Sequence, residues 1–391
     1  MVAVALLDRG TEPAAARARG PVAMSDEHAP PDYARMHGWD REYRVFVPPE
    51  IPQYSGAVSF CKRPYVEDPE ILLARAPDVA VIGAPFDDGV SYRPGARFGP
   101  RAIRQATYNQ GGYSLQLDVE PFAVLDVVDA GDANIVPAWL ERGHAMIYRK
   151  VLEVAASGAV PIILGGDHSI TWPAASAVAA VRAPGSIGIV HFDAHADTAD
   201  EDWGVLAGHG TPMRRLIESG AVKGRNFVQV GLRGYWPPPE VFEWMRANGL
   251  RWHLMREIEE RGAEAVVDEA IEQALDGPDA IYLSIDIDVL DPGSAPGTGT
   301  PEPGGLITRE LLRAVRQIVG RVNLAAMDIV EVAPAYDVAE ITAAAAHRCA
   351  LEAISALAVK KRAGQSVRFE GQRSIELPPV GPRVRAAGAG G

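Results

Sequence analysis

Three short runs of the sequence gather side chains that commonly bind metal ions. Each run places Asp and His, or several Asp, at or directly after an apolar stretch. They are residues 164–169 (LGGDHS), 191–198 (HFDAHADT) and 284–292 (SIDIDVLDP). Burying an unpaired charge costs several kcal/mol per ion, so a packed core does not gather carboxylates without cations to neutralise them. The three runs therefore predict a cation site.

The spacing within the runs predicts a shared set of ligands. The candidates in the second run are two residues apart, and so are those in the third, so on continuing strands each set would project to one face. A histidine of the first run joins them at the pocket mouth. The six candidate ligands are His168, Asp193, His195, Asp197, Asp286 and Asp288.

The chemistry of this set favours hard divalent cations. Four carboxylates and two imidazoles without a thiolate suit Mn²⁺, and other first-row ions such as Ni²⁺ are compatible. The set offers more ligands than one tetrahedral ion needs, which predicts two ions that share bridging carboxylates. Two ions about 3.5–4 Å apart can share a hydroxide that is nucleophilic at neutral pH.

Each motif alone also has a structural interpretation. An Asp at a strand end is usually a helix N-cap or a turn former, and the GGDH run alone is compatible with a tight strand-to-helix turn. The conjunction of three such strand ends favours a metal site. His191 lies deeper in its strand, so we expect a core or supporting residue there. Asp167, Thr198 and Asp291 are expected to be caps or hydrogen-bonding partners of the ligands.

The surrounding sequence predicts the elements that position these runs. Short β-branched runs at 79–83, 124–128, 160–164, 187–192, 227–230, 280–287 and 322–330 alternate with helical patterns at 138–157, 171–182, 309–319 and 338–360. Continuous apolar strands between amphipathic helices indicate a parallel sheet covered on both faces, in a three-layer, doubly wound α/β domain. In such a sheet, ligands bind beyond the carboxyl ends of the strands.

The ends of the chain differ in composition from its middle. Residues 1–68 are rich in Pro, charge and aromatic side chains without a sustained period, which predicts a partly irregular extension. Residues 69–366 are expected to form one catalytic domain. Residues 367–391 end in Ala and Gly, which predicts a flexible tail.

Charge and composition exclude several classes of partner. With 38 basic and 51 acidic side chains, the formal charge is −13, so the chain lacks the basic footprint of a nucleic-acid binder and suits a cationic ligand better. Cys61 and Cys349 are too few for a disulfide framework. No run approaches the roughly 20 apolar residues of a membrane span, and residues 1–23 do not form a signal peptide. We therefore expect a cytoplasmic protein without a membrane partner.

The three clusters, in this order, resemble those of the ureohydrolases, the family of arginase, agmatinase, guanidinobutyrase, guanidinopropionase and formiminoglutamase. The resemblance runs from about residue 79 to residue 360. It implies a three-layer α/β domain with a mostly parallel eight-stranded sheet, two Mn²⁺ per subunit, and a homotrimer or homohexamer. It also implies a small guanidino substrate that is cut to urea and an amine.

The resemblance assigns each ligand to one of two manganese ions. One ion would be held by His168, Asp193, Asp197 and Asp286. The other would be held by His195, Asp193, Asp286 and Asp288. Asp193 and Asp286 are then the bridges, and Asp197 would also receive the proton of the nucleophile.

Two further residues match family motifs outside the clusters. His209, in the run GHGTP, resembles the loop histidine that passes a proton to the departing amine. Glu331 resembles the carboxylate that pairs with the substrate guanidinium. The alternatives are a loop histidine without a role and a strand-end carboxylate that faces solvent.

The substrate tail is less constrained than the guanidinium head. Residues 199–204 (ADEDWG) are acidic and aromatic where arginase has Asn and Ser groups for the amino-acid end, so arginine is disfavoured. Residues 295–305 and 331–334 are similar to those of agmatinases, which makes agmatine, cut to putrescine and urea, the first expectation. Arg214 and Arg215 resemble guanidinobutyrase-type members and leave 4-guanidinobutyrate or 3-guanidinopropionate as alternatives. Free guanidine is a third alternative if Trp203 or Trp236 fills the tail pocket.

The loop at residues 85–97 also resembles the family and is expected at the pocket mouth. Ser91 and Tyr92 are predicted to contact the substrate tail, together with Thr300. Arg93 and Arg97 are expected to anchor the loop or a subunit contact as readily as to bind substrate. Two other classes compete with this interpretation: a single-zinc deacetylase on the same fold and an inactive metal-stabilised scaffold.

Overall fold

The computed structural model of the chain describes residues 39–40, 45–46 and 52–368. The chain divides into two compact units, Met1–Pro52 and Gln53–Gly391. In the first unit, strands β1 (Trp39–Asp40) and β2 (Val45–Phe46) pair antiparallel. Most of the predicted extension at 1–68, and nearly all of the predicted tail at 367–391, lies outside the described residues.

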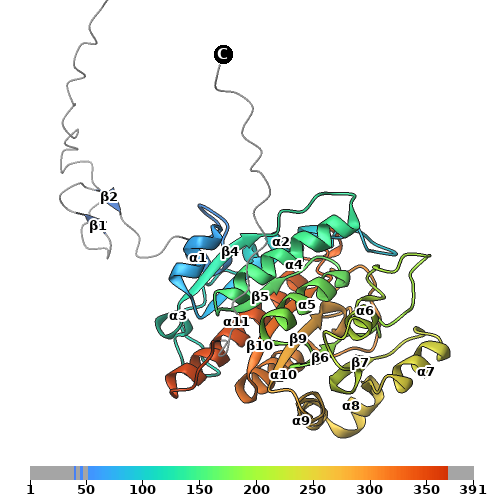
Figure 1. The fold of residues 1–391 in the computed structure, drawn as a ribbon. Helices are drawn as coiled ribbons and strands as arrows, with labels where there is room; N and C mark the ends of the chain where they lie inside the picture. Colours follow the sequence, from blue (N-terminus) through green and yellow to red (C-terminus); the bar gives the residue numbers. More distant parts are fainter. Residues whose placement is uncertain (1–38, 41–44, 47–51, 369–391) are drawn as a thin grey trace, which may run out of the picture. The chain divides into compact units, whose positions relative to one another are not determined.

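The second unit is built around an eight-stranded sheet (Figure 1). Its order is β4-β3-β5-β10-β9-β6-β7-β8, and every neighbouring pair is parallel. The strands are β3 (Val79–Gly83), β4 (Val127–Asp132), β5 (Val160–Leu164), β6 (Ile187–Phe192), β7 (Phe227–Leu232), β8 (Arg251–Leu254), β9 (Ala280–Asp286) and β10 (Leu324–Val330). The predicted fold class is therefore confirmed.

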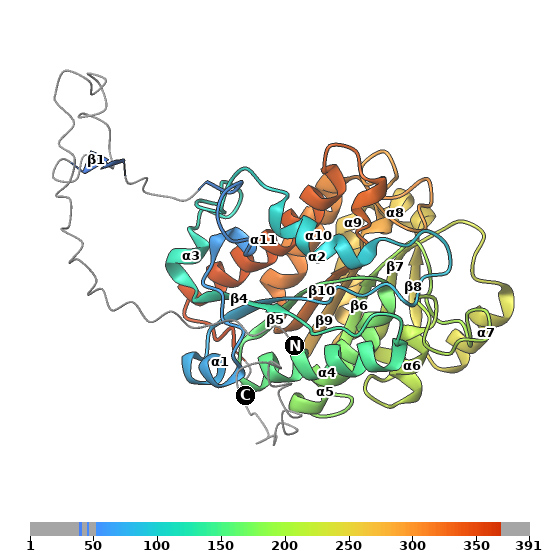
Figure 2. The same ribbon diagram turned by 90° about the horizontal axis from the view of Figure 1, so that it is seen from above.

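Helices cover both faces of this sheet (Figure 2). One layer contains α1 (Pro69–Arg75), α4 (Leu140–Ala156), α5 (Thr171–Arg182), α6 (Pro212–Glu218) and α7 (Pro239–Ala247). The opposite layer contains α2 (Gly99–Gln105), α3 (Pro121–Val124), α8 (Met255–Arg261), α9 (Ala263–Ala274), α10 (Thr308–Arg321) and α11 (Ile341–Arg362). Each layer buries its own apolar cluster against the sheet, as a doubly wound domain requires.

Three differences between the predicted and the observed elements have a clear local cause. The strand predicted at 124–128 begins at Val127, because Pro121 starts the short helix α3 just before it. Strand β8 was not predicted, since its sequence, RWHL, is short and mixes charged and apolar side chains at the sheet edge. Helix α11 begins at Ile341 rather than near 338, because Glu340 adopts a left-handed backbone with φ 60°.

The four central strands carry the motif residues at their carboxyl ends. β5, β10, β9 and β6 are consecutive neighbours, and all four are buried along their length. Their register pairs Leu164 with Ile329, and Asp286 with Val330. The strands thus end close together, and the side chains that follow them gather at one edge of the sheet.

Among the described residues, no helix combines the length and the apolar character needed to cross a membrane.

Candidate metal centre

The second and third motif runs leave their strands earlier than expected. β6 ends at Phe192, so Asp193, His195 and Asp197 do not sit on a continuing strand, and the alternation argument for that run was wrong. Turns bring the side chains together instead: Asp193 Oδ1 accepts from the His195 backbone N–H at 2.6 Å. Asp197 adopts a left-handed backbone with φ 50°, which turns the chain again.

In the third run, a hydrogen-bonded turn after the strand also places the second carboxylate. β9 ends at Asp286, and a short 3-10 helix, η7 (Ile287–Val289), follows it. Asp286 Oδ1 accepts from the Asp288 backbone N–H at 2.8 Å, so the carboxylate caps the turn that places Asp288. The cap and the candidate ligand are therefore the same side chain, and the two interpretations of a strand-end Asp both hold here.

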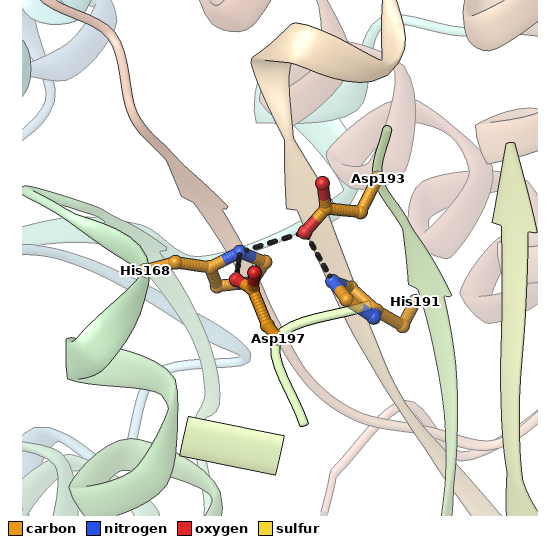
Figure 3. A group of neighbouring side chains, drawn as sticks. All are labelled: His168, His191, Asp193 and Asp197. Atoms are coloured by element: carbon orange, nitrogen blue, oxygen red, sulfur yellow. Dashed lines mark hydrogen bonds and ion pairs between the residues drawn. The ribbon is translucent and has the colours of Figure 1, made fainter. Parts of the chain in front are cut away.

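His168 faces three carboxylates. Its Nδ1 atom lies 3.0 Å from Asp193 Oδ2, 2.9 Å from Asp197 Oδ2 and 3.1 Å from Asp286 Oδ2 (Figure 3 shows the first two). The same buried Nδ1 makes no well-aligned hydrogen bond to any of them. A nitrogen and three oxygens that crowd a common point without hydrogen-bond alignment are the donor arrangement that a cation requires.

A second group of donors shares Asp193 with the first. His195 Nδ1 lies 3.0 Å from Asp288 Oδ2 and 3.5 Å from Asp193 Oδ1. Asp193 thus presents one oxygen toward each histidine, as a bridging carboxylate would. Asp286 presents one oxygen toward His168 and uses the other for the Asp288 backbone.

The electrostatics of these groups show how strongly the carboxylates need positive charge. Burial, followed by the neighbouring Asp193, raises the pKa of Asp197 to about 7. Burial acts to lower the pKa of His168, but its contacts to three carboxylates outweigh burial and hold that pKa well above its ordinary value. Protons on the histidines thus partly neutralise the cluster, and divalent cations would displace them. The donors present fit two such ions.

Two buried hydrogen-bond chains support the candidate ligands from behind. His191, fully buried, places Nε2 at 2.8 Å from Asp193 Oδ2, and its Nδ1 lies 3.1 Å from Gln229 Nε2. This position agrees with the supporting role expected of His191. His168 Nε2 lies 3.0 Å from Ser284 Oγ, which donates to Asp328 Oδ1 at 2.7 Å. Because Ser284 engages Nε2, the other ring nitrogen of His168, Nδ1, remains available to coordinate a metal ion.

Three of these supporting residues were not singled out from the sequence. Gln229 and Asp328 are polar side chains in otherwise apolar strands, and that interruption is the signal that would have found them. Ser284 lay inside a quoted motif and precedes Asp286 by two residues, so it shares the parity of a ligand.

His209 and Glu331 form a buried pair beside the centre. Glu331 Oε1 accepts from the His168 backbone N–H at 2.8 Å and lies 3.0 Å from His209 Nδ1. Ser91 contacts the other ring nitrogen of His209, with its Oγ at 2.7 Å and its backbone N at 3.1 Å from Nε2. Burial opposes the charged form of His209, but Glu331 outweighs burial and raises the pKa of His209 to about 9.

The second oxygen of Glu331 has no partner. Oε2 is buried without a hydrogen bond, and Glu331 holds a left-handed backbone with φ 63°. An unpaired buried carboxylate oxygen is costly, so its retention indicates that a ligand completes it. The alternative of a solvent-facing strand-end carboxylate is excluded by its burial, with 1% of the residue exposed.

A pocket of about 420 Å³ opens above the centre. It is lined by Ser91, His195, Asp197, Glu201, Asp202, Trp203, His209, Gly210, Trp236, Asp286 and Thr300. Among the described residues, no lysine or arginine contributes to this lining. The structure therefore brings three candidate ligands, His195, Asp197 and Asp286, to one cavity with His209, Ser91 and Thr300, whereas Glu331 is not part of its lining.

Tyr92 and the candidate arginines lie elsewhere. Tyr92 is 65% exposed and is not part of the pocket lining. Arg214 pairs with Asp200 and Glu218, and Arg215 pairs with the same two acids, so both arginines are engaged outside the pocket.

The loop at residues 85–97 is anchored by its own charges. Arg97 pairs with Asp87 and Asp88. The Arg93 guanidinium lies 5.2 Å from the Tyr92 ring centre and 5.4 Å from that of Tyr336. Both arginines therefore hold the loop, one of the two roles expected of them.

Another group of potential ligands lies far along the chain from the motifs. His253, Glu257 and Glu269 place donor atoms within 4.8 Å of one another. Arg261 pairs with both glutamates, so its guanidinium already supplies the positive charge of this group. The group is a surface charge network rather than a second metal centre.

Comparison with known proteins places this geometry in a family. The Arginase family model matches residues 77–355. The chain is 38% identical over 291 residues to proclavaminate amidinohydrolase of Streptomyces clavuligerus, covering 74% of this chain and 90% of that protein. The solved structure of that enzyme has a TM-score of 0.72 and covers 79% of this chain and 99% of its own.

Relatives with other substrates are equally similar. Mitochondrial agmatinase of Gallus gallus is 39% identical over 303 residues, which are 78% of this chain and 87% of the relative. Guanidinobutyrase of Pseudomonas aeruginosa is 38% identical over 288 residues, 74% of this chain and 88% of the relative. The family depends on a pair of metal ions, in agreement with the two groups of donors. The chain belongs to the arginase family and is an amidinohydrolase that acts on the carbon–nitrogen bonds of linear amidines.

Proposed function

We propose that this enzyme hydrolyses agmatine to putrescine and urea, with two Mn²⁺ ions per subunit. The observation that supports this choice most directly is the charge of the pocket. Its lining contains Glu201 and Asp202 beyond the candidate metal ligands, and within the described residues it contains no basic side chain apart from histidine. A cationic tail is attracted to such a pocket and a carboxylate tail is repelled.

The six candidate ligands would hold the ions in two groups that share Asp193. His168 with Asp193, Asp197 and Asp286 forms the first group. His195 with Asp193 and Asp288 forms the second, with Asp286 as the further bridge expected from the family. When bound, the two ions supply a nucleophilic water-derived oxygen at neutral pH and Lewis acidity for the charge that develops.

Glu331 orients the guanidinium. Its free Oε2 can accept two charge-assisted hydrogen bonds from the substrate, and its buried position makes each one stronger than in water. The His168 backbone N–H and His209 fix Oε1, so the carboxylate cannot rotate away. The planar guanidinium carbon is then held in one orientation for attack.

Asp197 and His209 move the protons. Asp197 Oδ2 lies 2.9 Å from His168 Nδ1 within the first group of donors, so with the ions bound this carboxylate would lie beside the nucleophile and could accept its proton and release it again. His209 lines the same pocket, and its Nε2 accepts from the Ser91 backbone N–H at 3.1 Å. Once that contact opens, the protonated ring can donate from Nε2 to the departing amine. Urea and putrescine then leave through the pocket mouth.

The dimensions of the pocket favour a substrate with a tail. A volume of about 420 Å³ lies in the ordinary range for small-molecule sites and exceeds the need of free guanidine, so Trp203 and Trp236 line the tail pocket without filling it. The second candidate is 4-guanidinobutyrate, which the similarity to guanidinobutyrase favours. The positions of Arg214 and Arg215 outside the pocket weigh against it.

Urea release from parallel substrates tests the proposal. Purified enzyme loaded with Mn²⁺ is assayed with agmatine, 4-guanidinobutyrate, 3-guanidinopropionate, arginine and guanidine, and bound metal is counted by elemental analysis. We expect two ions per chain and the highest kcat/KM for agmatine. One zinc per chain would favour a deacetylase-like enzyme, and absence of urea from every substrate would favour an inactive scaffold. Preference for a carboxylate substrate would overturn agmatine alone.

The proposal extends to the domain organisation, assembly and location of the enzyme. We propose a catalytic domain at 69–366 between an extension and a tail, and a homotrimer or homohexamer as in the family. A cytoplasmic location is supported by Cys61 and Cys349, which are both buried free thiols. Nucleic acid and membrane are not proposed as partners.

A further inference from the structure

Three consecutive acids at the pocket mouth have different surroundings. Asp200 lies 3.2 Å from Arg214 and 3.3 Å from Arg215. Asp202 accepts from the Gly210 backbone N–H at 2.7 Å, which closes the loop onto the His209 segment. Glu201 has no hydrogen bond or ion pair with any described residue, yet it lines the pocket. One carboxylate of the three is therefore free to meet a substrate.

We propose that Glu201 determines substrate specificity by pairing with a terminal ammonium group on the tail of the guanidino substrate. This inference rests on the proposed function, because it takes the substrate head to be bound at the metal centre. The ligand class is a guanidine joined by a short alkyl chain to a primary amine. Glu201 then binds the end of the substrate that does not react.

The pocket connects the two ends of such a substrate. Its lining includes the candidate ligands His195, Asp197 and Asp286 as well as Glu201. Trp236 belongs to the same lining, and its ring centre lies 6.1 Å from that of His195 in an edge-on arrangement. The methylene groups of a tail can pack along this tryptophan between the reactive end and the carboxylate.

The arginines next to the pocket are arranged to leave Glu201 unpaired. Arg214 and Arg215 both reach Asp200 and Glu218, and the Arg214 guanidinium lies 4.6 Å from the Trp244 ring centre. These contacts hold the two cations on the helix α6 side. A substrate carboxylate would thus meet Glu201 without a compensating cation, which disfavours the guanidino acids.

Substitution of Glu201 tests this assignment with three tails of matched length. Agmatine, 4-guanidinobutyrate and butylguanidine carry a cationic, an anionic and a neutral end on the same guanidine. The variants are E201Q and E201K, and D200N is the matched control, because Asp200 is the neighbouring acid outside the pocket lining. Each variant is loaded with Mn²⁺, its bound metal is counted, and kcat/KM is measured for all three substrates.

The ratio of kcat/KM for agmatine to that for butylguanidine is the informative quantity. We expect E201Q to lower this ratio about two- to fivefold, the range of a partly exposed ion pair, mainly through KM. E201K should lower it further. The same variant should raise the ratio of kcat/KM for 4-guanidinobutyrate to that for butylguanidine. D200N should retain the wild-type ratios, because Glu218 still pairs with both arginines and holds them on the α6 side. If the wild type prefers agmatine and E201Q keeps the wild-type ratio, Glu201 does not have the proposed role. A wild-type enzyme that does not prefer agmatine overturns the proposed substrate instead.

Discussion

Glu331 uses one carboxylate oxygen within the protein and leaves the other buried without a partner. In E331Q, the amide retains the shape but replaces an ionised oxygen facing the guanidinium with a neutral group. Losing one partner of a buried charge pair costs about 2–5 kcal/mol, so we expect kcat/KM for urea release to fall about thirtyfold or more. Steady-state assays measure this loss.

Metal analysis provides the control for Glu331. The side chain is not among the candidate ligands, so E331Q should bind two ions as the wild type does. Wild-type kcat/KM in a fully loaded E331Q enzyme would show that the guanidinium pairs elsewhere. Loss of metal in the variant would instead show that Glu331 supports the centre through the His168 backbone.

Ser284 connects His168 to the buried Asp328. In S284A, the His168 Nε2 atom loses its partner at 3.0 Å and Asp328 loses one of its three hydroxyl donors. Such supporting contacts change metal affinity about 10- to 100-fold. We expect Mn²⁺ titration of S284A to show weaker binding by this factor, with urea release restored at high Mn²⁺ concentration.

Tyr282 offers the matched control for Ser284. Its hydroxyl donates to Asp328 Oδ2 at 2.6 Å and has no contact with His168. Y282F therefore removes a hydroxyl from the same carboxylate and the same strand without breaking the link to the ligand. Equal Mn²⁺ affinities in S284A and Y282F would contradict a specific role of Ser284.

At the residue scale, the sequence predicted the candidate ligands better than the buried residues that hydrogen-bond to them. His168 and the five other candidates stood out because acids and histidines follow apolar strands. Asp328 did not, since a single polar residue in a strand carries no spacing signal. Tyr92 resembled a tail-binding residue by motif, but side-chain direction in a loop is set by packing that the sequence does not display.

Among the elements, the turn after β5 depends on the absence of a side chain at Gly166. A Cβ at this position would lie 1.7 Å from the Phe86 carbonyl oxygen and 2.7 Å from the Phe86 nitrogen, both backbone atoms. The next residue, Asp167, donates its backbone N–H to the same carbonyl at 2.8 Å. We expect G166A to lose about 1–3 kcal/mol of unfolding free energy or more, and to lose urea release because His168 moves.

Gly320 provides a control on helix α10. Nothing lies within 4 Å of a Cβ built there, and the residue is exposed. G320A should therefore gain about 0.5–1 kcal/mol, since alanine loses less backbone entropy in a helix. Urea-induced unfolding of both variants measures the two effects, and a stability of G166A equal to the wild type would contradict the close approach.

The elements were predicted best where apolar character is continuous. β3, β5 and β6 matched the expected ranges because buried parallel strands are uniformly apolar. The edge strand β8 and the start of β4 were missed, because one is mixed in polarity and the other follows a helix begun by Pro121. The turns that carry Asp193 and Asp288 depend on local hydrogen bonds rather than on strand alternation.

For the whole molecule, buried neutral histidines connect stability to pH. His347 donates from Nδ1 to the Ile103 carbonyl at 2.8 Å, stacks on Phe60, and is 3% exposed. Burial lowers the pKa of His347 to about 4, whereas the unfolded chain has a value near 6.5. Between these values the unfolded state binds more protons, so the stability contributed by the neutral form falls as pH drops from about 6.5 to 4.

H347Q removes this titration. The expected effect is a smaller loss of unfolding free energy between pH 7 and pH 4 than in the wild type, by about 3 kcal/mol at the acid end. Urea denaturation of the metal-free proteins at several pH values measures it. Parallel pH profiles in the two proteins would show that His347 is already protonated in the fold.

The order β5-β10-β9-β6 has a consequence for synthesis on the ribosome. All six candidate ligands are encoded by residue 288, yet β10, at Leu324–Val330, is the strand that lies between β5 and β9. A nascent chain whose β10 is still inside the ribosome already carries every donor atom. It lacks the strand that lies between β5 and β9 and so holds His168 beside Asp286. Tight metal loading therefore belongs to the finished polypeptide, and prematurely terminated products would not retain the metal ions.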